Sequence, residues 1–187
     1  RFASVKVASA LADVYSSAMV SLRQMLSAQL PQILTLMRDI FAATPNTGPL
    51  RAVSQALELY GVEPAEADAL ADALEQLSEV TCRWLSGAGA AEADPELATA
   101  FFQLCHKGLV FRPAVMNSLS TMPAVFEAAI GCICHQEFTH TRAALALLTL
   151  FTSGTDASMQ HRDMALHCLQ NSGGRLVEQC ICALASV

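Results

Sequence analysis

The chain has 187 residues, of which 53% are apolar, and its formal net charge is −6. The apolar share exceeds the roughly 45–50% of an ordinary soluble domain. The acidic balance argues against direct nucleic-acid binding, because phosphate recognition needs a basic patch. Two stretches without a charged residue, 113–126 and 143–155, are shorter than the roughly 20 residues of a spanning helix, so no membrane insertion is expected.

A helical period of 3.6 residues recurs along the chain, and the alternating pattern of a strand is absent. In the first segment Val7, Leu11 and Val14 share one helix face, and Leu50 and Val53 begin a similar face later. The predicted helices cover, in chain order, about residues 2–17, 30–43, 50–60, 64–86, 95–111, 122–135, 139–153 and 159–185.

Proline and glycine mark several predicted helix ends. Asp94-Pro95 is a strong helix start, because an acid caps the first turn and proline suits the first helical position. Residues 87–91 (GAGAA) are expected to form a linker. Gly173-Gly174 interrupts the last helix and predicts either a kink or a split into two helices.

Helix spacing predicts the architecture. The approximate helix pairs are 1–43, 47–86, 94–135 and 139–187, a period typical of HEAT and armadillo repeats, which span roughly 40–47 residues. The predicted fold is therefore all-α, an α-α superhelix in which antiparallel pairs stack as one array, with the second helix of each pair on the concave side. A compact helical bundle with a ligand or enzymatic site is the competing arrangement.

The chain begins without methionine, which predicts a fragment of a longer array. The outer faces of its first and last helices would then lack the neighbours that cover them, and we expect apolar residues there to be partly exposed. These residues are Val7, Leu11 and Val14 in the first helix and Ile181 and Leu184 in the last.

The most informative cluster of side chains is acidic. Seven acids and no Lys or Arg lie between Glu58 and Glu79. Four of them recur at helical spacing and are expected to form one stripe opposite the apolar face: Asp68, Asp72, Glu75 and Glu79. This stripe predicts a protein-binding surface for a basic partner, and the competing interpretation is an ordinary solvated helix face.

The seven cysteines do not resemble a secreted disulfide framework, because their number is odd and they lie in apolar helices. They indicate a reducing compartment. The Cys-x-Cys pairs at 132–134 and 180–182 diverge on a helix, so no metal site is expected. No nucleophile or glycine-rich motif points to catalysis, so neither an enzyme nor a cofactor is predicted.

Several motifs together resemble a known family. Residues 94–104 (DPELATAFFQL) are similar to a helix in the C-terminal HEAT repeats of the transportin-SR and importin-thirteen branch of the importin-β (karyopherin) family. Further segments resemble neighbouring helices of that family in the same order: 30–34 (LPQIL), Thr44-Pro45, Phe111-Arg112-Pro113, 125–130 (VFEAAI) and 175–177 (RLV).

This resemblance implies a segment of a nuclear transport receptor in the cytoplasm and nucleus. Such a receptor binds cargo proteins, here expected to be basic, through its helical-repeat surface. The Ran GTPase governs cargo binding and release in the full-length protein. The family carries its cargo contacts in no short motif, so no individual residue is transferred. A HEAT-repeat scaffold or adaptor unrelated to nuclear transport is the alternative.

Overall fold

The computed structural model describes residues 4–61, 67–87, 89–134, 138–153 and 162–185. None of these residues forms a β-strand, so the predicted all-α class is confirmed for the described part of the chain. The α-helices are α1 (Val5–Leu22), α2 (Leu30–Ala43), α3 (Thr47–Tyr60), α4 (Ala67–Leu85), α5 (Ala90–Ala93), α6 (Pro95–Phe111), α7 (Pro113–Ser118), α8 (Met122–Gly131), α9 (Phe138–Thr152) and α11 (Arg162–Ala185). A 3-10 helix, η1 (Arg23–Gln29), joins α1 to α2.

Side-chain caps fix the starts of α1, where Ser4 accepts from the N–H of Lys6, and of α3 and α6. The Asp94 carboxylate accepts a hydrogen bond from the backbone N–H of Leu97 at 3.0 Å, and Pro95 occupies the first turn of α6, as predicted. The Asn46 side chain caps α3 by accepting from the N–H of Gly48 at 3.0 Å. These caps satisfy backbone donors that the helix itself leaves without partners.

Other boundaries differ from the prediction. The expected linker at 87–91 includes the start of α5, which follows Gly89 at a φ of 72° that favours glycine. Helix α1 extends five residues beyond the predicted end, and α8 ends at Gly131 instead of continuing to His135. The predicted starts of the fourth helix at Pro64 and of the last helix at Met159 lie outside the described residues.

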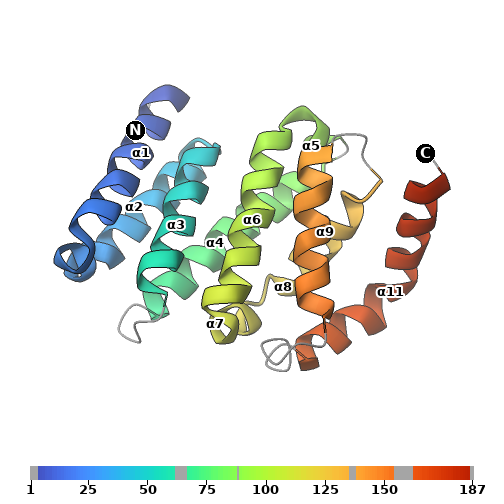
Figure 1. Cartoon of the computed structure of the whole chain (residues 1–187). Helices are drawn as coiled ribbons and strands as arrows, with labels where there is room; N and C mark the ends of the chain where they lie inside the picture. The colour runs from blue at the N-terminus through green and yellow to red at the C-terminus, as the bar shows by residue number, and fades with distance from the viewer. Residues whose placement is uncertain (1–3, 62–66, 88, 135–137, 154–161, 186–187) are drawn as a thin grey trace.

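The last helix, α11, is continuous through Gly173-Gly174 and is not split. Figure 1 shows a bend near its middle, where the two glycines lie. A Cβ atom added at either glycine would meet nothing within 4 Å, so no close helix contact requires glycine there. The bend instead follows from the weak helix propensity of two consecutive glycines.

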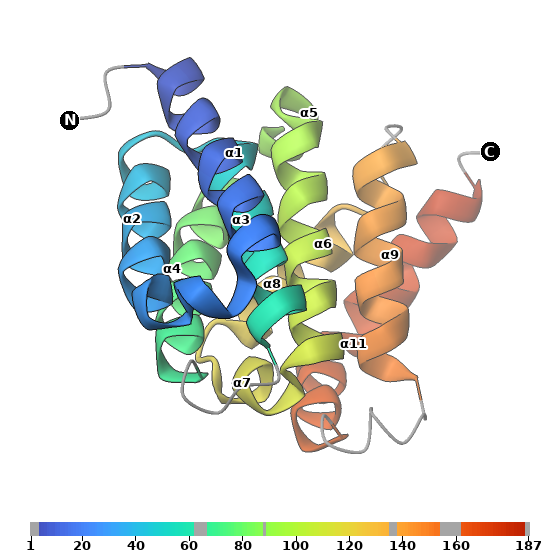
Figure 2. The same cartoon turned by 60° about the vertical axis from the view of Figure 1, so that its left-hand side comes forward.

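The helices pack in two rows (Figure 1). In the first row α1 packs on α3, α3 on α6, and α6 on α9. In the second row α2 packs on α4, while α4 and α11 both contact α8. Figure 2 shows α2 and α4 to the left of α1 and α3, with α11 on the opposite side of the molecule. The most extensive contacts therefore join alternate helices within a row.

The apolar core runs between the two rows. It includes Phe41 of α2, Phe101 and Phe102 of α6, and Phe151 of α9, all of them at most 2% exposed. The rings of Phe126 and Phe151 lie 5.6 Å apart and connect α8 to α9. Each aromatic ring removes a large apolar area from water, which stabilises the contact between neighbouring helices.

Apolar side chains are exposed at both ends of the rows. Val7 and Val14 of α1 are 58% and 63% exposed, and Ile181 and Leu184 of α11 are 60% and 79% exposed. The expected exposure of the end helices is therefore confirmed for these four residues. Leu11 is half-buried.

One described segment, Val5–Ala43, is long and apolar enough to cross a membrane by length and composition alone. It does not form one straight helix. Helix α1 ends at Leu22, η1 turns the chain, and α2 runs back beside α1 (Figure 2).

Candidate protein-binding site

Helix α4 carries the predicted acidic stripe in the second row. Its buried face includes Leu70, Leu74 and Leu77, each at most 1% exposed. Residues Asp68, Asp72 and Glu79 lie on the opposite, solvent-exposed face, as the helical period requires. The expected stripe is thus present for three of its four acids.

Glu75 lies on the same helix face but is partly buried, because its carboxylate is engaged within the fold. Its carboxylate accepts hydrogen bonds from the hydroxyl groups of Ser120 and Thr121, the latter at 3.2 Å. Both donors lie just before α8, so Glu75 connects α4 to the turn between α7 and α8. The sequence pattern did not indicate this contact, because its partners lie 45 and 46 residues away.

Glu79 is also occupied. It forms an ion pair with Arg83 at 2.7 Å, one helical turn further along the exposed side of α4. No hydrogen bond or ion pair joins Asp68 or Asp72 to another residue in the part of the chain that the structure describes. A basic protein segment can therefore pair with these two carboxylates without breaking a contact within the fold.

Asp72 also lines a shallow groove between α2 and α4. The groove has a volume of about 230 Å³. Its other lining residues are Pro31, Leu34, Thr35, Arg38, Ala69 and Ala73. Arg38 is paired with Asp39 at 3.0 Å, so the Asp72 carboxylate stands beside an apolar and partly neutralised surface.

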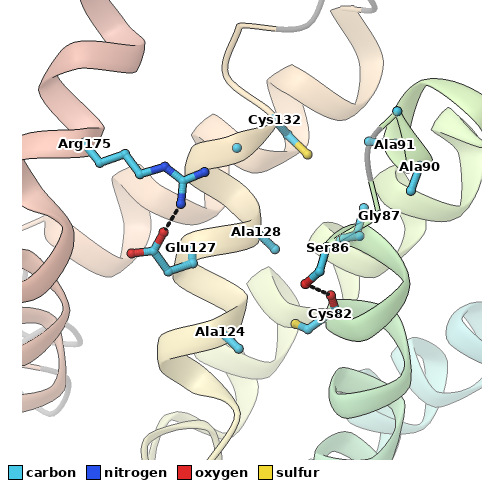
Figure 3. Close-up of a pocket in the computed structure, with 13 residues that line it drawn as sticks. Cys82, Ser86, Gly87, Ala90, Ala91, Ala124, Glu127, Ala128, Cys132 and Arg175 are labelled. Atoms are coloured by element: carbon cyan, nitrogen blue, oxygen red, sulfur yellow. Dashed lines mark hydrogen bonds and ion pairs between the residues drawn. The ribbon is translucent and has the colours of Figure 1, made fainter.

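A larger groove of about 580 Å³ lies further along the second row (Figure 3). One wall comes from the end of α4 and from α5, and it includes Cys82, Ser86 and Ala91. The other wall is α8, where Ala128 and small neighbouring residues face the groove. The groove was not foreseen from the sequence, because its walls come from segments distant along the chain.

An ion pair closes one side of this larger groove. Arg175 of α11 reaches Glu127 of α8 (Figure 3). Glu127 also accepts a hydrogen bond from the Ser172 hydroxyl. Glu127 thus holds α11 against α8 through two donors. The small side chains elsewhere on the walls leave room for the side chains of an incoming peptide or helix.

The thiols that line this groove are poor nucleophiles. Burial raises the pKa of Cys82 to about 12 and the pKa of Cys132 to about 11. Both groups are therefore protonated near neutral pH, and it is the thiolate that reacts. Neither thiol is therefore activated as a nucleophile.

A third groove lies in the first row, between α6 and α9. It is lined by polar and basic side chains that include Gln103, His106, Lys107 and Arg142. Burial and the nearby Lys107 lower the pKa of His106, and Lys107 itself pairs with Glu58 of α3. No group of three or more potential metal ligands occurs in the described residues.

No family model matches the chain, and no curated protein is significantly similar to it.

Proposed function

We propose that this chain is a HEAT-type helical-repeat array that binds other proteins, and that it is a segment of an importin-like nuclear transport receptor. The observation that carries the proposal is the two-row packing, in which the extensive contacts join helices that are close in chain order, such as α1 with α3, α3 with α6 and α6 with α9. The proposed repeat pairs are α1 with α2, α3 with α4, and α9 with α11, which are in contact, and α6 with α8. Solenoid proteins have this nearest-neighbour organisation.

The same packing speaks against a compact bundle with an internal site. The main contacts of α1 are with α3, η1 and α2, whereas those of α9 are with α6, α8 and α11. A bundle would bring the first and last helices around one centre. In the proposed superhelix, α2, α4, α8 and α11 line the concave side, which carries the two grooves beside α4.

The charge of this side indicates the partner. Helix α4 contributes four acids and one arginine, and Asp68 and Asp72 have no partner among the described residues. Carboxylates on a grooved surface raise the local concentration of a basic segment and accelerate its association. The proposed partner is therefore a lysine- and arginine-rich segment of a cargo protein.

Assignment to nuclear transport rests on the motif resemblance. The two-row packing is compatible with this role and equally with a helical-repeat protein of another function. In nuclear transport the cargo affinity depends on Ran in the full-length receptor. A scaffold or adaptor built from the same repeats is the alternative, and its affinity for a basic segment is independent of Ran.

The test uses a fluorescently labelled peptide rich in lysine and arginine, with an acidic peptide of equal length as control. Fluorescence anisotropy should show saturable binding of the basic peptide alone. Equal binding of both peptides, or of neither, contradicts the proposed binding surface. In the full-length protein, GTP-loaded but not GDP-loaded Ran should change the affinity by about 5–150-fold, a typical coupling between sites. No response to Ran would favour the scaffold.

A further inference from the structure

Cys134 lies where the turn after α8 meets the last helix. Its thiol donates a hydrogen bond to the backbone carbonyl of Gln179 in α11, with Sγ 2.9 Å from the oxygen. A helical carbonyl points along the axis toward the residues three and four positions later. The Cys134 sulfur therefore lies beside Cys182 and Ala183 on the surface of α11.

The surroundings of this sulfur contain two further thiols. Cys180 is half-buried and Cys182 is exposed, and both side chains are reduced thiols. Burial raises the pKa of Cys134, and the nearby Cys182 and Cys180 raise it further, while the backbone of Ala183 lowers it. Cys182 contributes more to this shift than Cys180 does, in agreement with its place three residues after Gln179.

We propose that Cys134 and Cys182 form an oxidisable pair of thiols, which a low-molecular-weight disulfide such as glutathione disulfide converts into a disulfide within the chain. The pair connects the turn after α8 to the terminal half of α11. It is separate from the acidic surface of α4 and does not depend on the function proposed above.

The reaction proceeds in two exchange steps. The exposed Cys182, as thiolate, attacks glutathione disulfide, forms a mixed disulfide and releases one glutathione thiolate. The Cys134 thiolate then attacks the Cys182 sulfur, and the second glutathione leaves. Two protein thiols thus lose two protons and two electrons, and one glutathione disulfide is reduced to two glutathione molecules.

The structural consequence concerns the terminal half of α11. This half follows the bend at Gly173-Gly174 and exposes Val177 and Ile181 to solvent. Its polar attachments to α8 and to the turn after α8 include the Arg175–Glu127 ion pair and the Cys134 hydrogen bond. A disulfide to Cys182 adds a covalent attachment beyond the bend and restricts movement of this half relative to α8.

The test treats the reduced protein with glutathione disulfide and follows it by mass spectrometry and peptide mapping. We expect the loss of two hydrogens and a cross-linked peptide that joins Cys134 to Cys182. The second step should accelerate between about pH 7 and pH 9, because the raised pKa of Cys134 leaves little thiolate at neutral pH. Amide hydrogen exchange in the terminal half of α11 should slow in the oxidised protein.

Three single variants separate the possible results, and a thermal melt of each verifies folding. Cys182→Ser should abolish the cross-link, whereas its matched control Cys180→Ser should retain it. Cys134→Ser should leave Cys182 as its glutathione adduct. The proposal is overturned if the cross-link survives in Cys182→Ser, if wild-type protein stops at the adduct, or if it stays reduced.

Discussion

Among the acids of α4, Glu75 differs from its neighbours in what its carboxylate contacts. It accepts hydrogen bonds from Ser120 and Thr121, whereas Asp72, one turn earlier on the helix, makes no such bond in the described structure. Glu75→Ala should therefore reduce the free energy of unfolding by about 1–2 kcal/mol and the melting temperature by about 2–8 °C. Asp72→Ala, the control, should change the free energy by less than about 0.5 kcal/mol.

Thermal melts followed by circular dichroism measure both variants. Equal melting temperatures for Glu75→Ala and Asp72→Ala would show that Glu75 belongs with the solvated stripe and does not connect α4 to α8.

The buried thiols of Cys82 and Cys132 predict a pH dependence of stability. Their pKa values in the folded protein are about 12 and about 11, above the ordinary value of 9.0. The folded state thus retains protons that the unfolded state loses. The stabilisation is complete below about pH 9 and is lost as pH rises toward the folded pKa values.

Urea unfolding at about pH 8 and pH 10.5 tests this linkage. Cys82→Ala and Cys132→Ala should each show a smaller loss of stability at alkaline pH than wild type does. The exposed Cys182→Ala serves as control and should retain the wild-type loss. A loss of equal size in all four proteins would contradict the assigned burial effect.

At the scale of the elements, local sequence signals determined the long helices. Asp94-Pro95 and Asn46 act within one helical turn, so their effects can be predicted without tertiary information. The short helices α5 and α7 and the 3-10 helix η1 are different. Each spans too few residues for a clear apolar period.

The position of α7 depends on a contact between helices. Met116 of α7 is fully buried, and a Cβ atom added to Gly108 of α6 would lie 2.5 Å from its sulfur. Gly108→Ala should destabilise the protein by about 1–3 kcal/mol through overpacking. Gly173→Ala is the matched control, since open space and helical backbone there should give a stabilisation of about 0.5–1 kcal/mol.

Chemical denaturation measures both glycine variants. A neutral or stabilising Gly108→Ala would mean that Met116 moves aside without cost, and that α7 does not depend on close packing against α6.

For the whole molecule, helix periodicity predicted the all-α class and the exposed apolar ends. It placed Asp68, Asp72 and Glu79 on one exposed face of α4. It did not reveal the role of Glu75 or the larger groove, because both depend on helices brought together from distant parts of the chain. The local sequence pattern determines which side of a helix is buried. The residues that this side contacts depend on how distant segments pack together.

The central claim is that the acidic, grooved side of the second row binds a basic protein segment. The most direct test is anisotropy with the basic peptide and the double variant Asp68→Lys/Asp72→Lys at low and moderate salt. The control is Asp13→Lys/Glu96→Lys, which changes the net charge equally by reversing exposed acids of the first row. We predict weaker binding and a shallower salt dependence in the α4 variant alone, chiefly through slower association. Equal effects in both variants, or unchanged binding in the α4 variant, would contradict the claim.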